Sequence, residues 1–160
     1  MSTAPDSPSS EISSSNSSNS SSSNAVPNPL PHLVTPEFVC LFGLHIANSS
    51  RPEALALMES LLRPAEPSSA SIFLVNAHTL NLAAVSSGYR QVLQSATYCL
   101  GDGTGVRWAA RQQGVALKAN LVGTDLIPAF LQATANRGYR YFLLGAAPEA
   151  IEQAAQFAQT

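Results

Sequence analysis

The feature that most constrains this chain is an alternation, from Phe38 onward, of short apolar runs with segments of helical periodicity. The run Ile72–Val75 is continuously apolar, and Tyr139–Leu144 is the most strand-like run in the chain. Continuous apolar runs are typical of strands buried on both faces in a parallel sheet. Strands that alternate with helices indicate βαβ units. The sequence therefore predicts an α/β fold with an open, mainly parallel sheet and helices on both faces, a Rossmann-like arrangement.

The individual elements can be placed from local signals. A first strand is expected over Phe38–Leu44, and Ser50 and Glu53 have the spacing of a capping box that begins a helix. The pattern predicts further strands at 72–75, 98–100 and 139–144, and further helices at 79–84, 89–96, 106–113, 125–136 and from 149 onward.

Length and composition allow one such domain. The chain has 160 residues, of which 45% are hydrophobic and 11% charged, enough for one α/β core but hardly for two. Residues 1–36 are rich in Ser and Asn, which predicts a disordered tail. We assign residues 37–160 to the N-terminal part of a single domain. Its last helical pattern stops at Thr160 without a cap or a following strand, so we expect the domain to be incomplete at its C-terminus.

Several classes of protein are disfavoured. The eight Lys and Arg residues lie from Arg51 onward without a basic cluster, which argues against nucleic-acid binding. Cys40 and Cys99 sit in apolar stretches without a CxxC partner, which disfavours disulfide and zinc frameworks. The N-terminus has no signal-peptide pattern, and no run approaches the roughly 20 apolar residues that span a bilayer. We expect a cytoplasmic protein whose membrane contact is at most peripheral.

The loops after the predicted strands are the expected place for chemistry. Ligands of open parallel sheets gather at the carboxyl ends of strands, where helix N-termini present free N–H groups. Four loops qualify by position, at 76–79, 101–105, 123–125 and 145–148. The candidate ligand-binding residues in them are Asn76, His78, Thr79, Gly103, Thr104, Gly123, Asp125 and Gly145.

The loop Gly101–Gly105 is the most informative of the four. Its three glycines allow close approach of a ligand to the backbone, and its Asp102 would repel a phosphate. The loop therefore suits a carboxylate that accepts a proton from a hydroxyl, and the neighbouring helix dipole would favour the ionised form that a base needs. From the loop alone, a turn residue or an N-cap is the favoured interpretation of Asp102.

The other three loops also have two interpretations. Asn76 and His78 are suited to hydrogen bonds with a sugar or a phosphate, but Asn76 can also be a turn residue and Thr79 an N-cap. Asp125 is more often a helix cap than a ligand contact. Backbone N–H groups at Gly145 can cradle a diphosphate, although a glycine is also the simplest way to turn a βα corner. The chain contains no DxD, HExxH, GxxxxGK[ST] or GxSxG motif, which removes the usual signals of metal, P-loop and serine-hydrolase chemistry.

Four segments in register resemble the WecG/TagA/CpsF glycosyltransferases. The resemblance runs from about Phe38 to Thr160, and an Asp-Gly pair directly after a strand is its most specific part. The segments are VNAHTLNLA (75–83), GDGTGVRWAAR (101–111), GTDL (123–126) and the stretch from GYRYFLLGA to Glu149 (138–149).

The resemblance implies an activity and a place. Such enzymes carry out an inverting, metal-independent transfer of N-acetylmannosamine or a related hexose from a UDP-sugar to a polyprenyl-diphosphate-linked saccharide. They act at the inner face of the plasma membrane, in the synthesis of bacterial cell-envelope polysaccharide. The family's aspartate matches Asp102, expected to deprotonate the acceptor hydroxyl, and the Asn of its TxN motif matches Asn76, expected near the phosphates of the donor. No cofactor is implied, and a homo-oligomer is left open.

Two positions depart from the family pattern. The Thr of TxN falls on Leu74, and an Arg found before the Gly-x-Asp-Leu segment falls on Asn120, which leaves Lys118 as the nearest cation. The family's later Gln-Glu segment would lie beyond Thr160, so this chain would lack part of the nucleotide site. These departures keep a second interpretation open, a catalytically inactive nucleotide-binding or regulatory module. A Rossmann-type oxidoreductase is disfavoured because GxGxxG is missing.

Overall fold

A computed structural model describes residues 1, 35–62 and 69–159 of the chain, and the predicted tail falls almost wholly outside these residues. Within them the sheet has four strands in the order β1-β2-β4-β3. The first pair is antiparallel, whereas β2 with β4 and β4 with β3 are parallel. The strands are β1 (Glu37–Leu41), β2 (Leu44–Asn48), β3 (Ile72–Val75) and β4 (Tyr98–Gly101).

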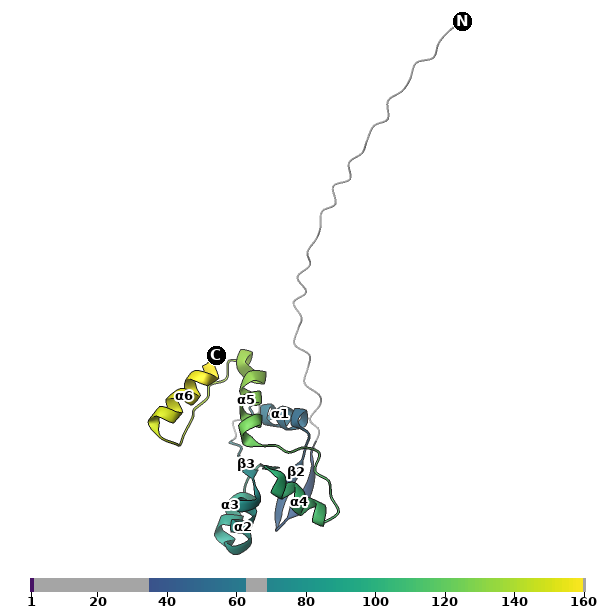
Figure 1. Cartoon of the computed structure of the whole chain (residues 1–160), viewed down its shortest axis with the longest axis vertical. Helices are drawn as coiled ribbons and strands as arrows, with labels where there is room; N and C mark the ends of the chain where they lie inside the picture. The colour runs from purple at the N-terminus through teal and green to yellow at the C-terminus, as the bar shows by residue number, and fades with distance from the viewer. Residues whose placement is uncertain (2–34, 63–68, 160) are drawn as a thin grey trace.

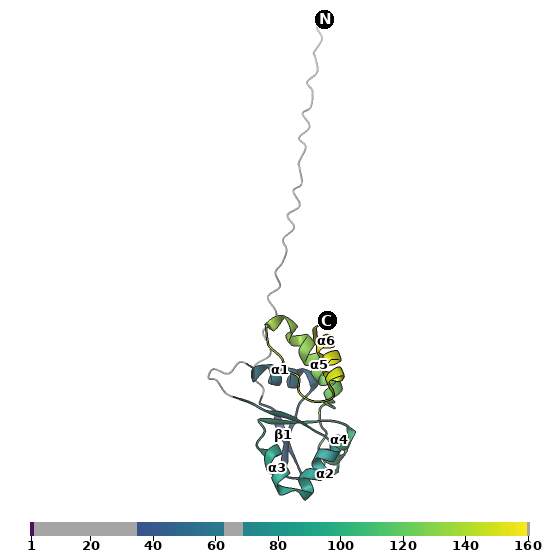
Figure 2. The same ribbon diagram turned by 90° about the vertical axis from the view of Figure 1, so that its left-hand side faces the viewer.

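Helices cover both faces of this sheet, as Figures 1 and 2 show. The helices α1 (Arg51–Ser60) and α5 (Gly123–Thr134) pack together on one face. The opposite face carries α2 (Ala77–Val85), α3 (Ser87–Gln94) and α4 (Thr104–Gln112). A 3-10 turn, η1 (Ala135–Arg137), and α6 (Pro148–Gln159) follow α5 along the chain.

The period-two alternation of the central strands explains the two cores. Ile46 of β2 and Cys99 of β4 are partners across the ladder and are buried against α2, α3 and α4. Their neighbours Ala47 and Leu100, also partners, are buried against α1 and α5. A strand with apolar side chains on both faces must be covered on both sides. The predicted α/β fold, mainly parallel with helices on both faces, is confirmed.

The first predicted strand was wrong in one respect. Phe38–Leu44 is not one strand, because the chain reverses at Phe42 and Gly43, where φ is +50° and +80°. Positive φ at both residues of a two-residue loop is the geometry of a tight β-hairpin. The usual Asn-Gly or Asp-Gly signal is absent, since Phe42 takes the place of the polar residue, and the turn was therefore not visible in the sequence.

The capping box that begins α1 is confirmed. The backbone N–H of Ser50 donates to Glu53 Oε2 at 2.7 Å, and the backbone N–H of Glu53 donates to Ser50 Oγ at 3.5 Å. Other helix boundaries differ from expectation. Gly88 lies inside α3, and α5 begins at Gly123, so that Pro128 falls in its second turn rather than its first.

The strand predicted at Tyr139–Leu144 is not found. This segment follows Gly138, which ends η1 with φ at +71°, and it joins no sheet in the described part of the chain. Phe142 is 87% exposed and Leu144 is 89% exposed. Tyr141 instead packs edge-on against Phe130 of α5. An apolar run becomes a strand only when a neighbouring strand takes its backbone hydrogen bonds, and the four-stranded sheet does not extend to it.

Of the two cysteines expected to be buried, only one is. Cys99 is buried as a small apolar residue, and burial raises the pKa of its thiol, whereas Cys40 is exposed, contrary to expectation. Both are free thiols. Among the described residues, no helix has the length and apolar character needed to cross a bilayer.

Gly105, at the second position of α4, brings the beginnings of α4 and α2 into contact. A Cβ placed on Gly105 would lie 2.7 Å from Ala77 Cβ, closer than two non-bonded carbon atoms can approach. Gly88, at the second position of α3, has no atom within 4 Å of such a Cβ. The two glycines therefore occupy equivalent helical positions but have opposite steric surroundings.

We predict that Gly105→Ala lowers the free energy of unfolding by about 1–3 kcal/mol, because overpacking forces the two helix ends apart. Gly88→Ala is the matched control and should raise it by about 0.4–1 kcal/mol, since it restricts only the unfolded chain. Urea unfolding of both variants measures the difference. Equal effects of the two substitutions would show that the α2–α4 contact at Gly105 is absent.

Candidate functional site

The carboxyl ends of β3 and β4 bring two candidate loops together. Val75 and Gly101, the last residues of these strands, are partners in the parallel ladder. The backbone N–H of Asp102 donates to the carbonyl of Val75 at 2.8 Å, which extends the pairing one residue beyond the strands. Asn76 and Asp102 consequently leave the sheet side by side.

The backbone around Asp102 is held while its carboxylate is free of protein partners. The carbonyl of Gly101 accepts from Leu121 N–H at 3.1 Å, and Gly103 N–H donates to Asn120 Oδ1 at 2.8 Å. Asp102 is half-buried as a residue, and its carboxylate makes no hydrogen bond or ion pair to any other described residue. The N-cap of α4 is Gly103, so Asp102 is not the capping residue of that helix. Asp102 lies just before α4, whose dipole favours a negative charge there.

Asn76 is the N-cap of α2, and Thr79 is not. Asn76 Oδ1 accepts from the backbone N–H of Thr79 at 3.0 Å and from its hydroxyl at 3.1 Å. The amide Nδ2 of Asn76 donates to no described residue, and the side chain is exposed. His78 is also exposed in the first turn of α2. The cap thus fixes the direction of Asn76 and leaves two amide hydrogens for a ligand.

The loop before α5 lies on the other face of the sheet, next to the ends of β3 and β4. A Cβ on Gly123 would lie 2.8 Å from Leu74 Cδ1, so Leu74 packs directly against the start of α5. The N-cap of α5 is Val122, without a side-chain cap, so Asp125 does not have the capping role. Arg51 Nη2 donates to the backbone carbonyl of Asp125 at 2.6 Å.

Gly145 is not brought to this region by a strand. It lies in the segment between η1 and α6, with φ at +120°, and nothing is within 4 Å of a Cβ built on it. Thr104, by contrast, is the first residue of α4 and is exposed beside Asp102. The structure therefore places Asn76, Gly103 and Thr104 next to Asp102, and the contact of Gly105 with Ala77 brings the first turn of α2, with His78 and Thr79, to the start of α4. Gly123 and Asp125, at the start of α5, contact Leu74 and Arg51 instead, and Gly145 lies apart.

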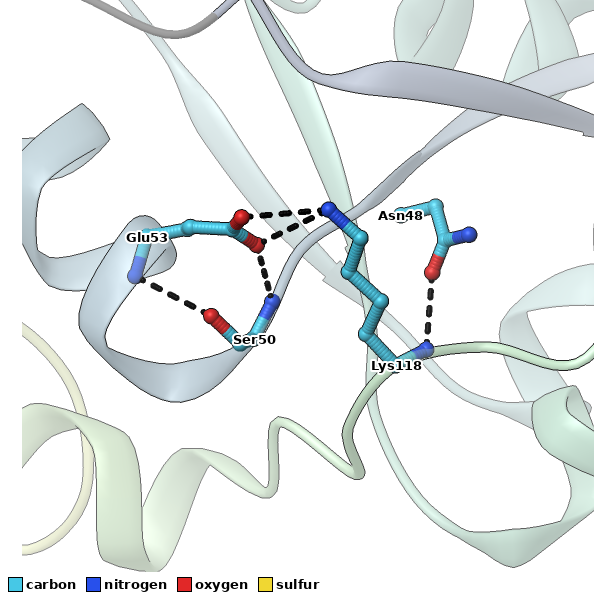
Figure 3. A network of polar contacts seen from close by, with 4 residues as sticks. All are labelled: Asn48, Ser50, Glu53 and Lys118. Carbon is cyan, nitrogen blue, oxygen red and sulfur yellow. Dashed lines mark hydrogen bonds and ion pairs between the residues drawn. The ribbon is translucent and has the colours of Figure 1, made fainter.

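Lys118 is engaged in a network of its own, shown in Figure 3. Its ammonium group lies 3.1 Å from Glu53 Oε1, and its backbone N–H donates to Asn48 Oδ1 at 2.8 Å. The backbone N–H of Ser50 and the ammonium of Lys118 together hold the pKa of Glu53 below its ordinary value of 4.5. The cation expected nearest to the donor phosphates is therefore already paired with a carboxylate.

Sequence reasoning missed two residues near the site. Asn120 was noted only as the loss of an arginine, yet its side chain binds the loop of Asp102. Arg51 lies at the beginning of α1, after the carboxyl end of β2, and reaches α5. The position of Arg51 after a predicted strand, next to the capping residue Ser50, could have marked it as a candidate. Its contact with a segment more than 70 residues away could not be predicted from the sequence.

A hollow of about 320 Å³ lies elsewhere on the molecule. Tyr98, the first residue of β4, contributes to it, whereas Asp102 follows the last residue of the same strand. Phe38 stacks on Tyr98 in its wall, with ring centroids 6.3 Å apart. Among the described residues, no three His, Cys, Asp or Glu side chains are grouped as metal ligands would be.

With this geometry established, comparison with known proteins defines the class. The chain belongs to the glycosyl transferase WecG/TagA/CpsF family, whose model matches residues 39–160. It is 32% identical over 120 residues to proteins of Staphylococcus aureus strains NCTC 8325 / PS 47, COL and MSSA476. Each is named N-acetylglucosaminyldiphosphoundecaprenol N-acetyl-beta-D-mannosaminyltransferase. The match covers 75% of this chain and 47% of each relative, so the chain spans about half the length of the curated relatives it matches.

The lowered pKa of Glu53 makes a testable contribution to stability. Because the folded pKa lies below the unfolded one, the stabilisation is complete above about pH 4.5 and is lost as the pH falls through the folded value. We predict that Glu53→Gln lowers the urea midpoint at pH 7 and that the difference from wild type shrinks at pH values below 4.5.

The control is Glu149→Gln, in the first turn of α6, whose carboxylate has no partner among the described residues. This variant should follow the wild-type dependence of stability on pH. A difference between Glu53→Gln and wild type that stays constant from pH 7 to pH 3 would contradict the ionic part of the network.

Proposed function

We propose that the protein containing this chain is an inverting, metal-independent glycosyltransferase in which Asp102 is the general base. The observation that carries the proposal is the state of Asp102: both flanking peptides are held by hydrogen bonds, while the carboxylate has no partner among the described residues and the residue lies directly before the N-cap of α4. Such an arrangement keeps an ionised oxygen in a fixed place for a substrate hydroxyl. Its position after β4, between the neighbouring strands β2 and β3, is where open parallel sheets bind ligands.

The proposed reaction is a single displacement. The acceptor hydroxyl gives its proton to Asp102 as its oxygen attacks the anomeric carbon of the sugar. The bond from that carbon to the diphosphate oxygen breaks with its electron pair, and the nucleoside diphosphate leaves with the negative charge. Attack opposite the leaving group inverts the anomeric configuration. General-base assistance of this kind typically contributes 10²–10⁴-fold to rate.

For the donor, we propose a site formed by the N-terminal ends of α2, α4 and α5. The free amide Nδ2 of Asn76 and the backbone N–H of Thr104, the first residue of α4, are donors suited to phosphate oxygens. His78 and Thr79 complete this side, and Gly123 and Asp125 the other. Because Lys118 is paired with Glu53, we propose Arg51 as the cation that offsets the charge of the diphosphate. The neutral donors add hydrogen bonds to its oxygens.

For the acceptor, we propose a polyprenyl-diphosphate-linked saccharide, since the relatives are named for transfer of N-acetylmannosamine to N-acetylglucosaminyldiphosphoundecaprenol. The donor would then be UDP-N-acetylmannosamine or a related hexose derivative. A lipid-linked acceptor and a cytoplasmic nucleotide sugar meet at the inner face of the plasma membrane, so we propose peripheral contact there. The pathway is synthesis of a cell-envelope polysaccharide.

The test is Asp102→Asn in the protein that carries this chain, assayed with UDP-N-acetylmannosamine and N-acetylglucosaminyl-diphospho-undecaprenol. We expect turnover to fall by about 10²–10⁴-fold, because the amide cannot accept the proton. Wild-type turnover should be unchanged by EDTA.

Two controls accompany this variant. Glu152→Gln, on the exposed surface of α6, should keep wild-type turnover. Calorimetry should show that Asp102→Asn still binds UDP, which separates loss of chemistry from loss of the donor site. Wild-type turnover in Asp102→Asn would remove Asp102 as the base, and UDP binding without transfer by the wild type would favour the inactive nucleotide-binding module.

A further inference from the structure

The direction of the Asp102 side chain is determined by the two peptide groups that flank it. One of them, between Gly101 and Asp102, is fixed by the hydrogen bond from Asp102 N–H to the carbonyl of Val75. The other, between Asp102 and Gly103, is fixed by the hydrogen bond from Gly103 N–H to Asn120 Oδ1 at 2.8 Å. Two fixed peptide planes set φ and ψ of the residue between them, and hence the direction of its Cα–Cβ bond.

We propose that Asn120 is a positioning residue for Asp102. Of the hydrogen bonds described above for Gly101, Asp102 and Gly103, only the one from Gly103 is made by a side chain. Gly103 has φ at +89°, and a Cβ built on it would have no atom within 4 Å, so no contact restricts that side of the residue. The hydrogen bond to Asn120 is therefore the contact that fixes the peptide group between Asp102 and Gly103, and with it ψ of Asp102.

Asn120 is itself well anchored. Two residues before it, the backbone N–H of Lys118 donates to Asn48 Oδ1 at the end of β2, and one residue after it, Leu121 N–H donates to the carbonyl of Gly101. The segment is thus attached to both β2 and β4. A short side chain between two anchors can hold its acceptor in a fixed place at little entropic cost, whereas an arginine has no acceptor atom for the N–H of Gly103.

This inference rests on the proposed function, in which Asp102 is the base, but it can be tested without activity. In Asn120→Ala the amide of Gly103 should exchange its hydrogen several-fold faster by ¹⁵N NMR, because its acceptor is gone. In Asn120→Asp the carboxylate still accepts from Gly103, so protection should persist.

Activity gives the second arm. Asn120→Ala should lower kcat by about 10–100-fold with a smaller change in the KM of the donor, as expected when a reacting group is misplaced. Asn120→Asp should recover part of kcat, with the acid limb of its pH profile moved to higher pH. In an Asp102→Asn background, Asn120→Ala should cost little more, since residues that act as a unit are not additive.

The matched control is Asn136→Ala, an exposed asparagine of η1 without a hydrogen bond to any described residue, which should change none of these readouts. Unchanged Gly103 exchange in Asn120→Ala, or an equal loss of kcat with and without Asp102, would overturn the proposal. Should Asn120→Ala not fold, loss of Gly103 protection in Asn120→Asp would overturn it equally. Full activity of Asp102→Asn would count against the proposed function alone, because the exchange results still decide whether Asn120 holds the loop.

Discussion

The parallel pairing of β3 with β4 is the interaction on which the rest of the site depends. Its register makes Val75 and Gly101 partners, and the hydrogen bond from Asp102 N–H to Val75 continues the ladder past the last strand residue. A shift of one residue would turn each side chain of β3 to the opposite face and separate Asn76 from Asp102. The burial of Val75 and Leu100 in separate cores opposes such a shift, so packing of the sheet fixes the geometry of the loops.

What could be predicted from the sequence followed from local periodicity. Three features that depend on residues close together in the chain were found as expected. They are the strand Ile72–Val75, the capping box of Ser50 and Glu53, and the loop after β4. The hairpin at Phe42 was missed because its turn uses a residue that rarely takes positive φ. The strand at Tyr139–Leu144 was wrong because strand formation depends on a neighbour, which no local pattern reveals.

The candidate site shows the same division. Asp102 and Asn76 were identified by their places after predicted strands, and the structure sets them side by side. The partners of Lys118 and Asn120 could not be found in this way, because each contact joins segments 17 to 70 residues apart. Lys118, noted from the sequence as the nearest cation, is paired with Glu53, and Asn120, first noted as the loss of an arginine, provides a hydrogen bond. Their catalytic roles remain proposals that the variants above address.

The exposed apolar segment after η1 has a consequence for handling the chain by itself. β3 stands last in the strand order of the described sheet, and Phe142 and Leu144 lie in the segment between η1 and α6 with more than four fifths of their surface in solvent. The edge strand of one molecule can pair with the exposed apolar segment of another molecule, and such pairing leads to edge-to-edge aggregation. Concentrated preparations of these 160 residues should therefore self-associate through this stretch, and a charged residue in place of Phe142 would keep them dispersed.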